Sequence, residues 1–145
     1  LYASGQAGER FAVRNSGSFA IVEGCGAHGC EYMTGGTAII LGAVGDNFGA
    51  GMTGGMAFIY DEKNEFENFA NPASIIWQTV ETDYWKKFLK ESIEDFANKT
   101  SSKKAKEILG NFKAELKNFK QVCPIEMLDK LDNPISLRPH TKKAG

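Results

Sequence analysis

Three stretches in the first half of the chain alternate between two kinds of apolar position. One kind pairs a small residue with a branched residue two places later: Ala20 and Val22, Ala38 and Ile40, Ala57 and Ile59. The other kind varies in size and includes one charge: Phe19, Ile21 and Glu23; Thr37, Ile39 and Leu41; Met56, Phe58 and Tyr60. Side chains of a strand alternate between its faces, so the uniform set should face a narrow interior. The variable set should face outward, and because it is mostly apolar it needs a cover from the second half of the chain.

The same stretches belong to a repeat. Residues 15–24, 33–42 and 52–61 align at spacings of 18 and 19 residues. A unit of this length is too short for a strand–helix–strand motif, which needs ~30 residues. It is typical of one coil of a parallel β-helix, in which the strands of successive coils stack ~4.8 Å apart. Glycines should form the turns between strands. The structural turn glycines that we expect are Gly8, Gly17, Gly24, Gly26, Gly35, Gly42, Gly45 and Gly54.

The composition changes sharply near residue 61. Residues 1–60 hold 14 of the 16 glycines and six charged residues, whereas residues 61–145 hold two glycines and 29 charged residues. The chain starts within a glycine-rich coil, so we expect a fragment of a longer chain or one subunit of a divided enzyme. The expected parts are β-helix coils over 1–61, a connecting arm over 62–81, a helical appendage over 82–131 and a disordered tail over 132–145.

Apolar residues at helical spacing predict a helical hairpin in the second half. A short connection near residue 100 would place two helices antiparallel to each other. In chain order, the expected elements are an extended segment over 73–80, a helix over 83–98 capped by Thr82, a helix from Ser101 or Ser102 to about Phe119, and a short helix over 125–131 after Pro124.

Charge and cysteine content exclude several classes of protein. The formal net charge of −1 gives no basis for a nucleic-acid or anionic-membrane partner. No apolar run reaches the ~20 residues of a membrane span. The three cysteines Cys25, Cys30 and Cys123 do not resemble a secreted disulfide framework. We therefore expect a cytoplasmic protein.

The segment Gly24–Gly29 matches the G-x-G-x-x-G pattern of dinucleotide sites. That pattern has meaning where it follows a strand and opens a helix. Here it leads into another strand of the repeat, and Gly26 shares its repeat position with Gly8 and Gly45. The structural interpretation is therefore favoured over nucleotide binding.

Cys25, His28 and Cys30 are the other candidates for chemistry. They could belong to a small-ligand or metal-binding module, but zinc sites use four ligands and no second ligand pair is present. A cysteine–histidine catalytic pair lacks an orienting third group. Small buried thiols are the favoured interpretation. We assign no catalytic, cofactor-binding or metal-ligating residue, and keep the metal or ligand site as the alternative.

Three motifs point to a family. The segments Arg10–Gly17, Gly29–Gly36 and Asn47–Ala57 closely resemble the C-terminal GXGXG domain of the glutamate synthase large (alpha) subunit. The resemblance continues more weakly to about residue 131. A β-helix subunit of a formylmethanofuran dehydrogenase-like oxidoreductase is the alternative within this fold.

The resemblance implies a structural function. Glutamate synthase forms two glutamates from glutamine, 2-oxoglutarate and a reductant. Its GXGXG domain is a right-handed parallel β-helix that is non-catalytic and holds the amidotransferase and FMN domains. FMN and the 3Fe–4S cluster are then expected in other domains, with no cofactor in this chain. Other domains or subunits of the enzyme are the expected partners, and the exposed N-terminal coil would allow a homodimer.

Overall fold

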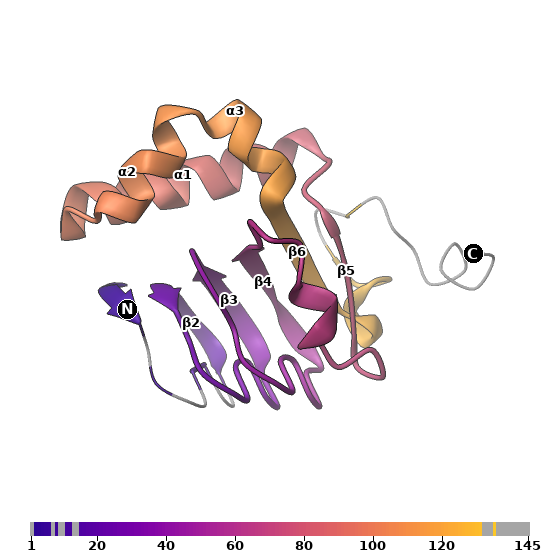
Figure 1. The fold of residues 1–145 in the computed structure, drawn as a ribbon. Helices are drawn as coiled ribbons and strands as arrows, with labels where there is room; N and C mark the ends of the chain where they lie inside the picture. Colours follow the sequence, from indigo (N-terminus) through magenta and orange to yellow (C-terminus); the bar gives the residue numbers. More distant parts are fainter. Residues whose placement is uncertain (1, 7, 9–10, 13–14, 132–134, 136–145) are drawn as a thin grey trace.

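The structure is a computed structural model, and it describes residues 2–6, 8, 11–12, 15–131 and 135. Its centre is one six-stranded sheet with the strand order β1-β2-β3-β4-β6-β5 (Figure 1). Four strands of this sheet are parallel: β1 (Tyr2–Gln6), which precedes the three repeats, and the repeat strands β2 (Ser16–Gly24), β3 (Thr34–Ile40) and β4 (Gly54–Tyr60). Two strands complete the sheet in antiparallel pairings: β6 (Phe119–Pro124) beside β4, and β5 (Ile75–Thr79) beside β6.

Helices cover one face of this sheet (Figure 1). They are α1 (Asp83–Thr100), α2 (Lys103–Gly110) and α3 (Phe112–Glu115). Single 3-10 turns are η1 (Phe66–Asn68), η2 (Leu116–Asn118) and η3 (Ile125–Met127). None of the helices in the described part of the chain is long and apolar enough to cross a membrane.

The register predicted from the repeat is confirmed. Ala20 pairs with Ala38, and Ala38 pairs with Ala57, in neighbouring parallel strands. The branched residues two places later, Val22 and Ile40, are also register partners. Equivalent positions of the repeats therefore lie side by side across the sheet.

The predicted fold class, a right-handed parallel β-helix, is wrong. A β-helix coil carries strands on more than one side, whereas each repeat here has one strand and then turns through residues 25–33 or 43–53. Several of these loop residues have positive φ, which a strand does not accommodate: 64° at His28, 58° at Cys30 and 55° at Tyr32. The chain is a mixed α/β fold with an open sheet, and its last two strands run antiparallel to their neighbours.

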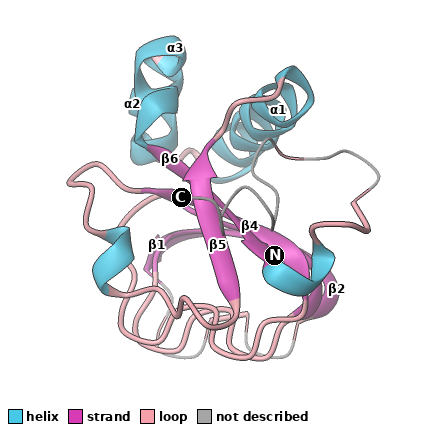
Figure 2. Cartoon of the chain, turned by 90° about the vertical axis from the view of Figure 1, so that its right-hand side faces the viewer, coloured by secondary structure: helices cyan, strands magenta, loops and turns pink. Residues whose placement is uncertain are grey.

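The two loops 25–33 and 43–53, here called the loop wall, lie along the face of the sheet opposite the helices (Figure 2). Backbone hydrogen bonds join equivalent positions of successive loops. The N–H of Cys25 donates to the carbonyl of Ala43 at 3.0 Å, and the N–H of Gly45 donates to that of Gly26 at 3.2 Å. The loop wall is thus held by the same repeat that aligns the strands.

Two hydrophobic cores lie on opposite faces of the sheet. The uniform set Ala20, Val22, Ala38, Ile40, Ala57 and Ile59 packs against the loop wall. The variable set packs with the helices, and its buried members include Ile21, Ile39, Leu41, Met56, Phe58 and Tyr60. The expectation that the second half of the chain covers the outward apolar face is confirmed.

The helical half differs from the prediction after residue 110. The predicted helix over 83–98 corresponds to α1, and the extended segment over 73–80 contains β5. The second helix ends at Gly110, and Phe119–Pro124 forms β6 because the free edge of β4 needs a hydrogen-bonding partner. The short third helix is reduced to the turn η3.

The remaining domain limits stay predictions. Of the predicted tail, residues 132–134 and 136–145 lie outside the described residues. Ile135 is described, and it is buried in the core under the helices.

A hydrogen-bonded contact fastens the helices to the sheet. The hydroxyl of Ser102, at the start of α2, accepts from the N–H of Ala105 at 3.1 Å and donates to the carboxylate of Glu23 on β2. This accounts for the one charge in the outward set, since a carboxylate is favourable near a helix N-terminus. The predicted cap Thr82 precedes α1 but makes no side-chain cap bond.

Replacing Gly54 tests the close approach of neighbouring repeats. A Cβ at Gly54 would collide with the backbone carbonyl of Thr34, so Gly54→Ala should lower the free energy of unfolding by about 1–3 kcal/mol. Gly17 holds the same repeat position but would have no atom within 4 Å of its Cβ. Gly17→Ala is therefore the matched control, and equal unfolding midpoints of the two variants in denaturant would contradict this packing.

Replacing Ser102 tests the contact between α2 and β2. Ser102→Ala removes the cap and leaves Glu23 without its hydroxyl partner, so the free energy of unfolding should fall by about 1–2 kcal/mol. Thr82→Ala alters a helix start that has no side-chain cap bond and should cost less. Denaturant unfolding at pH 7 measures both, and a larger loss in Thr82→Ala would contradict the assignment.

Candidate functional site

The glycine pattern at Gly24–Gly29 lies at the end of β2 and in the loop wall. The N–H of Gly26 donates to the carbonyl of Gly8, and the N–H of Gly45 donates to that of Gly26, each at 3.2 Å. The segment leads into turns and then β3, so no helix begins there. The geometry required for a dinucleotide site is therefore not formed.

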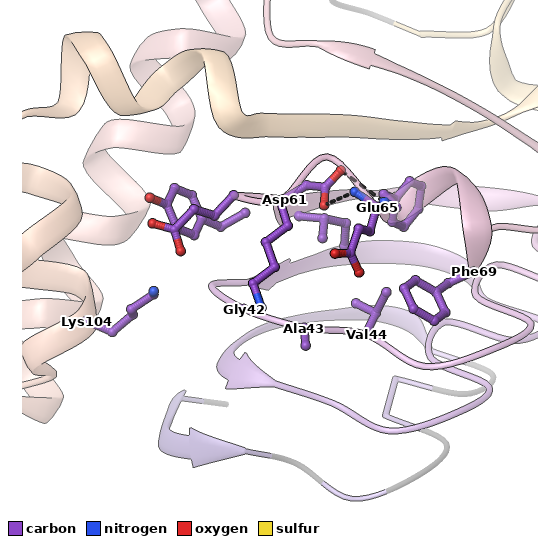
Figure 3. A pocket seen from close by; sticks show the side chains of 12 residues that line it. Gly42, Ala43, Val44, Asp61, Glu65, Phe69 and Lys104 are labelled. Carbon is purple, nitrogen blue, oxygen red and sulfur yellow. Dashed lines mark hydrogen bonds between the residues drawn. The ribbon is translucent and has the colours of Figure 1, made fainter.

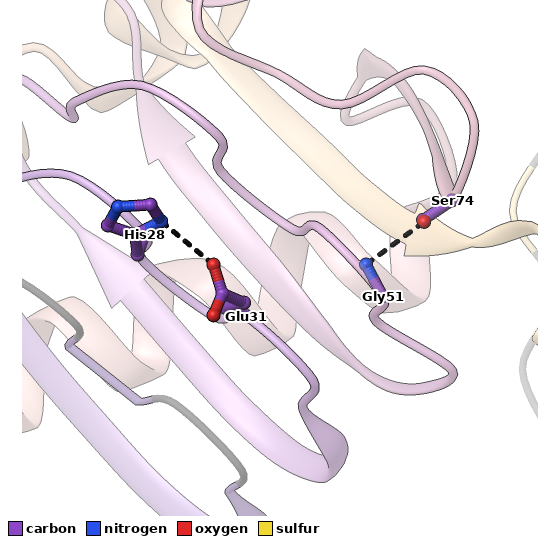
Figure 4. A network of polar contacts seen from close by, with 4 residues as sticks. All are labelled: His28, Glu31, Gly51 and Ser74. Carbon is purple, nitrogen blue, oxygen red and sulfur yellow. Dashed lines mark hydrogen bonds and ion pairs between the residues drawn. The ribbon is translucent and has the colours of Figure 1, made fainter.

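The structure does not bring Cys25, His28 and Cys30 together as a ligand set. Both thiols are buried in the core between the sheet and the loop wall. The imidazole of His28 is partly exposed, and its Nδ1 lies 2.8 Å from a carboxylate oxygen of Glu31 (Figure 4). Within the described residues, no group of three or more histidine, cysteine, aspartate or glutamate side chains could hold a metal ion.

Burial makes the cysteines poor nucleophiles. Removal from water raises the pKa of Cys25 and of Cys123 to about 12, and burial also raises the pKa of Cys30. Since the thiolate is the reactive form, these side chains stay protonated near neutral pH. They act as small apolar residues in the cores.

Two polar contacts stabilise the turns of the loop wall (Figure 4). Besides the His28–Glu31 pair, the N–H of Gly51 donates to the hydroxyl of Ser74 at 3.0 Å. The ring of Tyr32 packs over Gly51 and remains about half exposed. The contacts of Gly51 with Ser74 and with Tyr32 join segments that are distant in sequence, whereas the His28–Glu31 pair lies within one turn.

A hollow of about 260 Å³ was not anticipated from the sequence (Figure 3). It lies where the parallel strands β3 and β4 end, with α2 on one side. Its lining combines charged and apolar side chains: Gly42, Ala43, Val44, Ile59, Tyr60, Asp61, Glu62, Lys63, Glu65, Phe66, Phe69 and Lys104. The sequence signal for it was the run of charges that follows Asp61 where the repeat stops.

Asp61 shapes one wall of the hollow. Its two carboxylate oxygens accept from the N–H groups of Glu65 and Phe66 at 2.9 and 3.0 Å (Figure 3). The ammonium of Lys120 lies 3.8 Å away. The carboxylate therefore holds the turn that begins the segment 61–74 between β4 and β5, here called the third loop.

Tyr60 and Lys104 form the side of the hollow nearest the helices. The hydroxyl of Tyr60 donates to the carboxylate of Glu115, and the ammonium of Lys104 lies 5.0 Å from the centre of the Tyr60 ring. Burial, followed by the neighbouring carboxylate of Glu115, raises the pKa of Tyr60. Tyr60 is thus a neutral donor whose single hydroxyl proton is already used in the hydrogen bond to Glu115.

Comparison with known proteins identifies the family. The GXGXG motif family matches residues 1–125. The chain is 54% identical over 137 residues to the "Glutamate synthase [NADPH] large chain" of Azospirillum brasilense, covering 94% of this chain and 9% of that protein. It is 49% identical over 124 residues to the "Ferredoxin-dependent glutamate synthase" of Antithamnion sp., covering 86% of this chain and 8% of the relative.

A third relative is the "Glutamate synthase [NADH]" of Schizosaccharomyces pombe, which is 42% identical over 142 residues, 98% of this chain and 7% of that protein. The chain spans less than a tenth of the length of these relatives. The family predicted from the three motifs is confirmed. The chain belongs to the GXGXG motif family and corresponds to a segment of glutamate synthase large chains.

Proposed function

We propose that this chain is a non-catalytic structural module of a glutamate synthase, and that it holds the amidotransferase and FMN domains in place. The observation that carries the proposal is the burial of the repeat strands on both faces of the sheet, between the helices and the loop wall. Two well-packed cores make a stiff body, which is what a spacer between moving or reacting domains requires.

The names of the relatives support a function common to the whole family. They specify three different electron donors, NADPH, NADH and ferredoxin, yet each protein contains this segment at 42–54% identity. If this segment recognised the electron donor, we would expect its sequence to differ strongly between the NADPH, NADH and ferredoxin enzymes. We infer that it serves a step or an assembly that all three enzymes share.

The iron–sulfur cluster does not fit this chain. Such clusters are held by converging cysteine thiolates. Cys25 and Cys30 lie in the core beside the loop wall, whereas Cys123 lies in the core under the helices, on the other face of the sheet. We propose that the 3Fe–4S cluster and FMN are bound by other domains of the parent enzyme.

The cellular setting and assembly follow from the same proposal. Cys25, Cys30 and Cys123 are free thiols, which agrees with a reducing cytoplasm. The proposed partners are the other domains of the enzyme. Self-association through β1, which has β2 as its one neighbour among the strands that the structure describes, stays a prediction.

Damage to the module should uncouple the two reactions of the parent enzyme. In the longer glutamate synthase chain, Phe58→Ala empties a fully buried position under α1 and should cost roughly 3–5 kcal/mol of stability. Ammonia release from glutamine should continue, while glutamate formation falls several-fold because the domains are no longer held together. Assays of ammonia and glutamate on one preparation measure the ratio.

Tyr84→Ala is the control for this experiment, since Tyr84 is half exposed on α1. An unchanged ratio of ammonia to glutamate in a destabilised Phe58→Ala enzyme would contradict the structural role. So would glutamine-dependent turnover by the 145-residue chain alone.

The three cysteines should be protected in the folded chain. Because burial raises their pKa, labelling with a disulfide reagent at pH 8 should be negligible until denaturant unfolds the chain and exposes three thiols. Stability should also fall as pH rises above about 8.5, where the unfolded chain loses thiol protons that the folded chain keeps.

Lys90→Cys supplies a positive control, because position 90 is exposed on α1 and should be labelled immediately. Rapid labelling of Cys25 or Cys30 in the native chain would instead favour a thiol-based function at the loop wall.

A further inference from the structure

The hollow beside β3 and β4 exists because the start of the third loop is not hydrogen-bonded to the loop before it. After β2, the N–H of Cys25 donates to the carbonyl of Ala43 in the next loop. Ala43 occupies the equivalent position one repeat later. Yet no backbone hydrogen bond joins residues 43–47 to residues 61–65, all of which the structure describes. A gap therefore opens at a place where the earlier repeats are closed.

Other contacts hold the third loop in its displaced course. The N–H of Asp61 donates to the carbonyl of Asn118 at 2.7 Å, which directs the chain toward β6. Stacking resumes only where the N–H of Phe48 donates to the carbonyl of Phe69 at 2.9 Å. The hollow is thus bounded at both ends by backbone hydrogen bonds and is a feature of the fold.

The position of the hollow is typical of ligand sites in open sheets. Ligands bind outside the carboxyl ends of strands where the strand arrangement changes. Here β3 and β4 are parallel, and the next strand in the sheet, β6, is antiparallel. A volume of about 260 Å³ lies just below the ~300–1,000 Å³ of sites for drug-sized ligands, so a smaller molecule is indicated.

Opposite charges surround an apolar floor in this hollow. The buried side chains of Val44, Ile59 and Phe66 contribute the floor. Five charged residues line its sides, and they are Asp61, Glu62, Lys63, Glu65 and Lys104. The carboxylate of Asp61 is already engaged by the backbone N–H groups of Glu65 and Phe66, which leaves two glutamates and two lysines. Neither lysine has a carboxylate within the 4.0 Å of an ion pair among the described residues. Charges of both signs therefore share one small space without neutralising each other.

We propose that the hollow binds a small zwitterion with a compact apolar side group. Its carboxylate lies between the ammonium groups of Lys63 and Lys104 and the N–H of Ala43, which has no acceptor among the described residues. Its ammonium faces Glu62 and Glu65, and its side group covers the apolar floor. This function is additional to the structural role and does not depend on it.

L-Leucine and two of its analogues test the requirement for both charges. 4-Methylpentanoate and isoamylamine share the branched carbon skeleton of leucine, but the first lacks the ammonium and the second lacks the carboxylate. Titrations of the ¹⁵N-labelled 145-residue chain should give saturable NMR shifts with leucine at residues 42–44 and 61–66. Each analogue should bind at least about tenfold more weakly, because one pair of charges is lost.

Variants test the assigned side chains. Lys63→Gln and Glu65→Gln should each weaken leucine binding at least about fivefold while leaving the unfolding midpoint unchanged, since both side chains are exposed. Lys90→Gln, on the exposed side of α1, is the matched control and should bind leucine normally. Equal binding of leucine and both analogues, undiminished binding by the Lys63 and Glu65 variants, or no saturable shift with leucine would overturn the proposal.

Discussion

Backbone contact between equivalent positions of successive repeats is the constraint on which this structure depends. It requires glycine wherever two neighbouring repeats approach most closely, as at Gly54 against Thr34 and at Gly42 against Glu23. It also places like residues beside one another, so Ala20, Ala38 and Ala57 form one small-residue row across the sheet. That row leaves room for the large side chains of the loop wall, among them Met33, Phe48 and Met52.

The second half of the chain follows from this arrangement. A sheet with an apolar row on each face cannot be stable in water with only one face covered. The loop wall covers one face within the repeats, and the other face is left to α1 and α2, which come later in the sequence. The Ser102–Glu23 contact then fixes where α2 sits over β2. The glutamate synthase segment is therefore a single packed unit made from two very different kinds of sequence.

The sequence was informative where one repeat could be compared with the next. Glycine and alanine positions predicted the strand register, and the alternation predicted which side chains face the helices. The turns at His28, Cys30 and Tyr32 were not predictable, because positive φ at residues other than glycine is imposed by neighbouring loops. Phe119 fitted the apolar stripe of a helix, and only the unpaired edge of β4 makes it a strand residue. The hollow was not predicted because it depends on the absence of backbone hydrogen bonds between residues 43–47 and 61–65, which the sequence does not reveal.

Strand β6 limits where a further repeat could be added to the sheet. Because it pairs with β4 in antiparallel orientation and with β5 beyond, no further repeat can stack on β4. A duplicated unit of 18 or 19 residues could be accommodated between β2 and β3, where both neighbours offer parallel edges of the same register. Lengthening there would move β1 away from α1 while leaving the β4–β6–β5 end unaltered. The width of the sheet can thus change in steps of one strand spacing, ~4.8 Å, without any change to the end formed by β4, β6 and β5.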